Sequence, residues 1–122
     1  MIALLDACVV IDVLRSNAAA LSALAGAGTL AASEVTRFEV LAGRRPGEEA
    51  ATEALFDGLD WLVVDEGVAR RASALARDYR PSHSGIDDAD YLVAATALEY
   101  GAQLLTTNVR HFPMLPDLEA AY

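Results

Sequence analysis

Three acidic side chains stand at notable places in the chain: at the end of an expected strand, inside an expected helix among apolar residues, and at the start of another expected helix. Asp6 closes the apolar run IALLD, Glu39 lies within EVTRFEVLAG, and Asp90 belongs to GIDDADYLVAAT. Carboxylates that converge on one crevice repel one another unless a cation lies between them. Because this donor set contains hard oxygens without histidine or cysteine, it indicates Mg²⁺ or Mn²⁺.

The stretch GIDDADYLVAAT places three aspartates directly before an apolar run that is typical of a buried helix. We expect Asp87 to be the N-cap of that helix and to accept backbone N–H groups, which puts Asp90 in the first turn. The helix dipole there favours an ionised Asp90 but repels a cation, so Asp90 needs other acids across the crevice. Asp88 is expected either to be solvated or to support the direct ligands of the cation from outside.

Two of these acids also have an ordinary structural interpretation. Asp6 could simply cap the segment that follows it. Glu39 lies among apolar neighbours and could form a salt bridge, for which Arg37, Arg44 and Arg45 are the available partners. Both interpretations remain open at the level of sequence.

The elements that must position these acids alternate between strands and helices. Strands are expected at 2–6, 29–33, 61–65 and 102–107. Helices are expected at 9–15, 17–28, 34–43, from the RRPGEEA turn to about 57, and at 66–79 and 87–100. This alternation predicts an α/β fold in one domain, 1–122, with a mostly parallel twisted sheet and helices on both faces. In such sheets, ligands bind at the carboxyl ends of the strands.

Composition narrows the possible functions. The net charge is −9, and all nine basic residues are arginine, so sequence-blind electrostatic binding of nucleic acid is disfavoured. The single cysteine, Cys8, excludes a disulfide and is expected to be a small buried residue. His83 and His111 lie beside loops and form no recognisable ligand pair.

No apolar run approaches the ~20 residues of a membrane span. MIALLD does not resemble a signal peptide, so a cytoplasmic protein without a membrane partner is expected.

Three segments, in order, resemble the PIN domain family and specifically the VapC-type toxins of type II toxin–antitoxin modules. The first is LLDACVVIDVL, with Asp6 as its acid, and the second is SEVTRFEVLAG, with Glu39. The third and most specific is DYLVAATALEYGAQLLTTN, which begins at Asp90 and continues into NVRHF. The resemblance covers essentially the whole chain and implies a PIN-like fold.

The resemblance also implies a Mg²⁺-dependent endoribonuclease whose catalytic, metal-binding acids are Asp6, Glu39 and Asp90. Water would be the nucleophile, leaving 5′-phosphate and 3′-hydroxyl ends. RNA is the implied substrate. A cognate antitoxin would block the groove, and the implied assembly is a homodimer joined with that antitoxin into a hetero-oligomer.

The chain departs from the family pattern where many relatives carry a fourth acid. Asn108 and His111 stand at the two places where that acid is expected, and Asp87 or Asp88 would have to compensate. Cys8 stands where serine or asparagine is common.

Two further groups of residues are assigned supporting roles. Thr106 or Asn108 would position water or phosphate, and the candidate RNA contacts are Arg44, Arg45, Arg80 and Arg110.

Three other functions compete with the toxin. One is a PIN-fold module that binds RNA or antitoxin with weak or no catalysis. Another is a PIN nuclease in RNA processing outside any toxin module. The third is a metal-dependent phosphatase with a nucleophilic aspartate. It is disfavoured because the second aspartate of that class would stand at position 8, which is a cysteine.

Overall fold

The computed structural model describes all 122 residues and contains one sheet of four parallel strands. The strands follow the order β3-β2-β1-β4. Their bounds are Ile2–Leu5 for β1, Thr29–Ser33 for β2, Asp60–Leu62 for β3 and Gln103–Leu105 for β4. The predicted parallel sheet is therefore confirmed, and every strand in it is parallel to its neighbours.

Six α-helices and one short 3₁₀ helix connect and follow these strands. Their bounds are Ala7–Leu14 (α1), Ala18–Ala25 (α2), Glu34–Ala42 (α3), Glu49–Asp57 (α4), Glu66–Tyr79 (α5), Asp88–Tyr100 (α6) and Val109–His111 (η1). Side-chain caps start several of them, because an oxygen at the N-cap satisfies a free backbone N–H. Asn17, Ser33 and Asp65 accept such bonds at 2.9–3.0 Å. No single helix is long and apolar enough to cross a membrane, and α1 with α2 reaches that length only across a 113° bend.

The structure corrects several predicted boundaries, among them the end of the helix predicted at 17–28, which stops at Ala25. The first helix begins at Ala7 rather than at position 9, because Asp6 caps it immediately. The third and fourth strands are shorter than the predicted 61–65 and 102–107. Each strand ends where its neighbour leaves the sheet, since a strand needs a partner for its backbone groups. β3 has no partner beyond the end of β2, and β4 has none beyond the end of β1.

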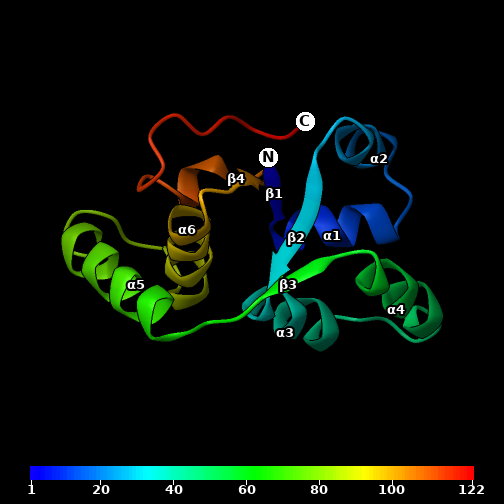
Figure 1. The fold of residues 1–122 in the computed structure, drawn as a ribbon, viewed down its shortest axis with the longest axis horizontal. Helices are drawn as coiled ribbons and strands as arrows, with labels where there is room; N and C mark the ends of the chain where they lie inside the picture. The colour runs from blue at the N-terminus through cyan, green and yellow to red at the C-terminus, as the bar shows by residue number, and fades with distance from the viewer.

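Alternate residues of the strands build two cores, one on each face of the sheet. Leu4, Ala31 and Leu104 pack with α5 and α6. Leu5 and Ala32 point the other way and pack with α1, α3 and α4. This division follows from the two-residue period of a strand and confirms helices on both faces. Figure 1 shows α5 and α6 on one side of the sheet and α1 and α4 on the other.

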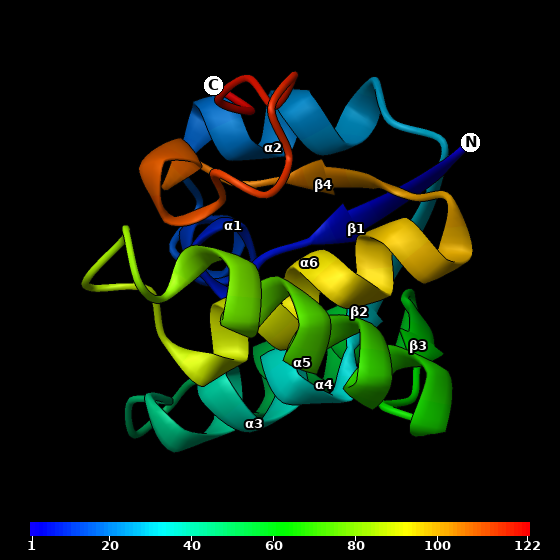
Figure 2. The ribbon, with the colours of Figure 1, turned by 90° about the vertical axis from the view of Figure 1, so that its left-hand side faces the viewer.

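Parallel strands bring their carboxyl ends to one edge of the molecule. β1 passes into α1 at Asp6, β2 passes into α3 at Ser33, and β4 ends just before Thr106. In Figure 2, the first turn of α6 and the start of α1 lie at this same edge. The candidate acids are therefore carried by elements that meet there.

Replacing Leu4 by alanine should destabilise the protein by about 2–5 kcal/mol, because Leu4 is fully buried and its truncation leaves a cavity. Leu21, which is 46% exposed on α2, supplies the control, and Leu21→Ala should change stability by no more than about 0.5 kcal/mol. Urea unfolding followed by circular dichroism measures both. Equal losses would contradict this assignment of the core.

Candidate active site

Asp6 is a buried carboxylate at the carboxyl end of β1, where it is only 7% exposed. Its Oδ1 accepts a hydrogen bond from the N–H of Ala7 at 2.9 Å, so Asp6 does cap α1. Its Oδ2 accepts a second bond from the hydroxyl of Thr106 at 2.8 Å. The capping interpretation thus accounts for only one of the two oxygens, and the other joins Asp6 to the end of β4.

Thr106, which is predicted to position water or phosphate, is buried beside Asp6. It is 0% exposed, and its hydroxyl faces Asp6 rather than solvent. Cys8 was expected to be a buried residue, but it is only half-buried: it packs against the core on the α1 side and also contacts the site. Its Sγ lies 3.5 Å from Asp6 Oδ2 and also 3.5 Å from the hydroxyl oxygens of Thr106 and Thr107. Only the two-residue spacing from Asp6 could have indicated this contact from sequence.

Glu39 is a half-buried carboxylate on α3 without a cationic partner. Arg37 instead pairs with Glu34, at 2.6 Å between Nε and Oε1. Arg44 and Arg45 are exposed, and neither makes an ion pair within 4 Å. The salt-bridge interpretation of Glu39 is therefore wrong.

The pKa of the Glu39 carboxyl is raised, and the causes identify its surroundings. Burial is the largest cause, because it penalises the charged form. The negative charges of Asp6, Asp90 and Asp87 raise the pKa further. Asp6, Asp87 and Asp90 therefore lie near enough to Glu39 for their charges to act on it, at the carboxyl edge of the sheet.

Asp90 lies in the first turn of α6, with Asp87 at the N-cap as predicted. The two form a capping box, in which Asp90 Oδ2 accepts from the backbone N–H of Asp87 at 3.1 Å. Burial raises the pKa of Asp90, whereas this hydrogen bond and the nearby His111 lower it, and Asp6 raises it again. His111 Nδ1 lies 3.6 Å from Asp90 Oδ2. The sequence did not predict this contact, although His111 stands at one of the two places where a fourth acid is expected.

The other predicted residues lie around this centre or away from it. Asp88 pairs with Arg80 on the side of α6 that faces α5, so it does not reach the mouth of the site as one of the compensating acids. Asn108 is exposed, and its backbone N–H donates to Thr106 Oγ1 at 3.1 Å. Arg110 is exposed on η1 and makes no ion pair.

The donor chemistry of the site suits a hard divalent cation. No three acidic, histidine or cysteine side chains come close enough to hold a metal ion between them. Mg²⁺ does not require such an enclosure, because it keeps several waters and usually binds through one or two carboxylates. A half-buried Glu39 without a cationic partner, beside two further acids, is unfavourable on its own. The carboxylate oxygens of Asp6, Glu39 and Asp90 are donors of the type that Mg²⁺ takes in proteins.

Comparisons with known proteins agree with this geometry. The chain belongs to the PIN domain family, whose family model matches residues 3–116. Among individual proteins, it is 53% identical to ribonuclease VapC19 of Mycobacterium tuberculosis, over 98% of both chains. It is 39% identical to ribonuclease VapC10 of the same organism, over 98% of this chain and 92% of that protein. A solved toxin–antitoxin complex from Klebsiella pneumoniae contains a chain that matches with a TM-score of 0.85 at 25% identity, over 98% of both chains. The resemblance found in the sequence is confirmed.

Removing the charge of Glu39 should stabilise the protein when no divalent ion is present. Because the pKa of Glu39 is raised on folding, its ionisation costs stability as the pH rises through that folded-state pKa. Glu39→Gln should therefore raise Tm at pH 7 by about 2 °C or more. The gain should vanish below the ordinary value of 4.5, where Glu39 is protonated in both states. Thermal unfolding in chelator measures the effect, with Glu119→Gln at an exposed position as control. A lower Tm for Glu39→Gln at pH 7 would refute the proposed repulsion.

Thr106→Val should destabilise the protein by about 1–3 kcal/mol, because the buried carboxylate of Asp6 loses a hydroxyl donor. Thr106→Ser keeps that donor and should recover most of the loss. Urea unfolding of the two variants separates the hydrogen bond from the packing of the threonine methyl group. If the serine variant is as unstable as the valine variant, the bond to Asp6 is not what makes Thr106 important.

Proposed function

We propose that this protein is a Mg²⁺-dependent endoribonuclease and the toxin of a type II toxin–antitoxin module. The observation that carries the proposal is the meeting of Asp6, Glu39 and Asp90 at the carboxyl edge of a PIN-domain sheet, without an arginine to neutralise them. The 53% identity to a protein named ribonuclease VapC19 supports RNA as the substrate. The likeness to a chain of a toxin–antitoxin complex supports the biological role.

Hydrolysis of a phosphodiester needs an activated water and neutralisation of charge on the phosphate. A bound Mg²⁺ supplies both, by lowering the pKa of water and by binding phosphate oxygens. Asp6 and Asp90 would hold the ion directly or through water, and Glu39 would bind or orient. Water rather than the ribose 2′-hydroxyl is the proposed nucleophile, which leaves 5′-phosphate and 3′-hydroxyl ends.

The remaining residues of the site keep these acids in place. The Ala7 N–H and the Thr106 hydroxyl hold opposite oxygens of Asp6, so this carboxylate cannot rotate freely. Asp90 is positioned through one oxygen, because Oδ2 accepts from the Asp87 N–H and lies 3.6 Å from His111 Nδ1. Orientation in advance reduces the reorganisation needed during the reaction. Asn108 is exposed between β4 and η1 and is the proposed contact to water or phosphate.

RNA must approach a protein whose net charge is −9. Arginines at the rim of the site would lower this barrier locally, since they bind phosphate oxygens in pairs. Four exposed arginines are proposed for this role: Arg44, Arg45, Arg80 and Arg110. Arg44, Arg45 and Arg110 make no ion pair within the protein, so their guanidinium groups are free to bind phosphate. Arg80 pairs with Asp88.

An antitoxin is the proposed protein partner, and a homodimer that joins with it into a hetero-oligomer is the proposed assembly. Large apolar side chains are exposed on α3 and after β3, with Phe38 71% and Val63 55% exposed. These side chains are proposed as apolar contacts that the antitoxin would cover. The solved toxin–antitoxin complex from Klebsiella pneumoniae supports an antitoxin as that partner.

A second candidate function is an RNA- or antitoxin-binding module with weak or no catalysis. The observation in its favour is the absence of an acid from the end of β4, where Asn108 and His111 stand. An RNA-cleavage assay decides between the two candidates, because the binding module should bind RNA or antitoxin without cutting RNA.

Asp6→Asn and Asp90→Asn should each lower RNA cleavage by at least about 100-fold, because each removes a charge proposed to hold the cation. Asp60→Asn is the matched control, since Asp60 is an exposed aspartate at the start of β3. Structured RNAs are incubated with each variant in Mg²⁺ and in chelator, and end-labelled products are resolved on gels. Cleavage that survives chelator or both substitutions would sink the metal-site proposal. Folded wild type that cuts no RNA would favour the binding module.

Growth provides an independent readout of the same proposal. Expression of the wild-type protein without a partner should arrest growth, whereas Asp90→Asn should not. Arrest by both would show that growth inhibition does not require the proposed site.

A further inference from the structure

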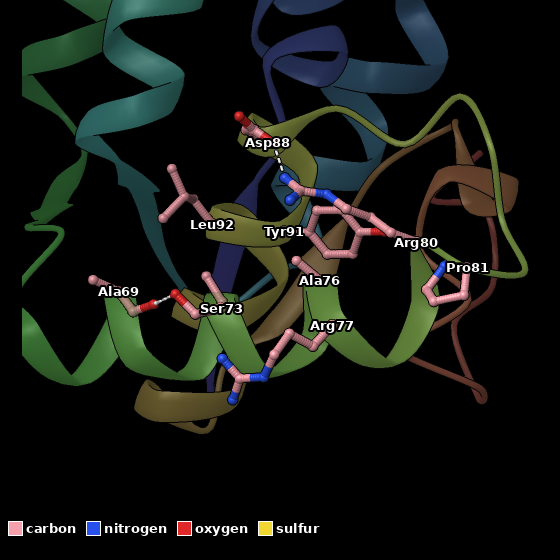
Figure 3. Close-up of a pocket in the computed structure, with 10 residues that line it drawn as sticks. Ala69, Ser73, Ala76, Arg77, Arg80, Pro81, Asp88, Tyr91 and Leu92 are labelled. Carbon is pink, nitrogen blue, oxygen red and sulfur yellow. Dashed lines mark hydrogen bonds and ion pairs between the residues drawn. The ribbon is translucent and has the colours of Figure 1, made fainter.

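A groove runs between α5 and α6, on the opposite side of α6 from Asp90. Its volume is about 520 Å³. Its floor consists of small or apolar side chains, among them Ala69, Ala72 and Ala76 of α5 and Leu92 of α6. Two arginines also line it, and Figure 3 shows Arg80 beside Asp88 and Tyr91, whereas Arg77 extends from α5 in a different direction. We call this feature the α5–α6 groove.

The groove borders the most positively charged stretch of an acidic chain. Residues 69–86 hold four of the nine arginines against a single acid, Asp78. Two of those arginines are already paired away from the groove, Arg70 with Glu66 and Arg71 with Glu99. The other two, Arg77 and Arg80, line the groove itself. The lining therefore carries two arginines against one acid, Asp88.

Arg77 and Arg80 differ in how available they are. Arg77 is exposed and makes no ion pair. Arg80 pairs with Asp88, and its Cζ lies 5.5 Å from the ring centroid of the buried Tyr91. A guanidinium group has five N–H donors, so Arg80 keeps donors for a further anion while Asp88 and Tyr91 fix its position.

The side of the groove that holds Arg80 lies beside the candidate active site. α5 ends at Tyr79 and α6 begins at Asp88, so the short loop between them holds Arg80 close to the first turn of α6. Figure 2 shows this loop at the same edge of the molecule as the start of α1. Asp88 faces the groove, whereas Asp90, two residues later, faces the acidic site. A strand that leaves the site across the start of α6 would enter the groove.

We propose that the α5–α6 groove binds single-stranded RNA beyond the phosphate that is cut, with backbone phosphates on Arg77 and Arg80 and a ribose or base over the apolar floor. This inference rests on the proposed ribonuclease function and names a second contact of the same substrate. Charge complementarity favours a polyanion here, because the groove is cationic on a protein that is otherwise strongly acidic. It also explains how an acidic chain holds RNA near three carboxylates.

Asp88 then has a role that differs from catalysis. It neutralises part of the charge on Arg80 and so limits RNA affinity. Asp88→Asn frees that guanidinium group and removes one negative charge from the groove. A gain of about 3-fold in RNA affinity is expected, which loss of a structural residue would not produce.

The test measures binding of a fluorescein-labelled, 20-nucleotide single-stranded RNA of mixed sequence by anisotropy, in the inactive Asp90→Asn protein. Arg77→Ala and Arg80→Ala should each weaken binding about 3–10-fold and reduce the slope of log affinity against log salt by about 0.7. Arg70→Ala and Arg71→Ala remove the same charge from the same helix outside the groove, so they are matched controls expected to bind like the parent.

Equal losses in all four arginine variants would overturn the proposal, since they would reflect net charge alone. A change in the mass measured by light scattering, with RNA affinity unaltered, would overturn it too and assign the groove to contact with a second copy. Cleavage by the active protein is scored separately. If that protein cuts RNA but Arg77→Ala and Arg80→Ala match their controls, only the groove proposal fails. If it cuts none while these variants still lose binding, the ribonuclease proposal fails and the groove stands.

Discussion

The buried carboxylate of Asp6 is the constraint on which the rest of the site depends. A carboxylate that is 7% exposed needs donors, and it obtains them from the first N–H of α1 and from Thr106 after β4. These bonds tie together the ends of two neighbouring strands and the beginning of a helix. Parallel pairing of β1 with β4 makes this possible, because it brings both carboxyl ends to the same edge.

The second governing feature is repulsion among the acids at that edge. Glu39 and Asp90 both have raised pKa values, with burial as the first cause and neighbouring carboxylates as a further one. An arginine among these acids would neutralise them and stabilise the fold. Arg37, the arginine of α3, binds Glu34 instead. The site therefore stores an unfavourable interaction that a cation would relieve. Such a cost is typical of functional sites.

Much of the fold could be predicted from the sequence because the signals are local. Asn17, Ser33 and Asp65 start helices where their types suggested, and the apolar runs alternate in the manner of a parallel sheet. Strand lengths could not be predicted, since Val63 and Val64 are apolar and suit a strand. They lie outside the sheet because β2 ends before it can pair with them. Strand ends depend on the partner strand, which lies far away in the sequence.

The stretch GIDDADYLVAAT shows the division most clearly. By itself the sequence determined that Asp87 caps a helix and that Asp90 lies in its first turn, because capping depends on a few adjacent residues. Only the tertiary structure decided that Asp88 faces Arg80 and α5 while Asp90 faces His111 and the other acids. It also decided that Cys8 and Thr106 contact Asp6, about a hundred residues away from Thr106 in the chain. These contacts depend on which helix covers which face of the sheet, and no local pattern encodes that choice.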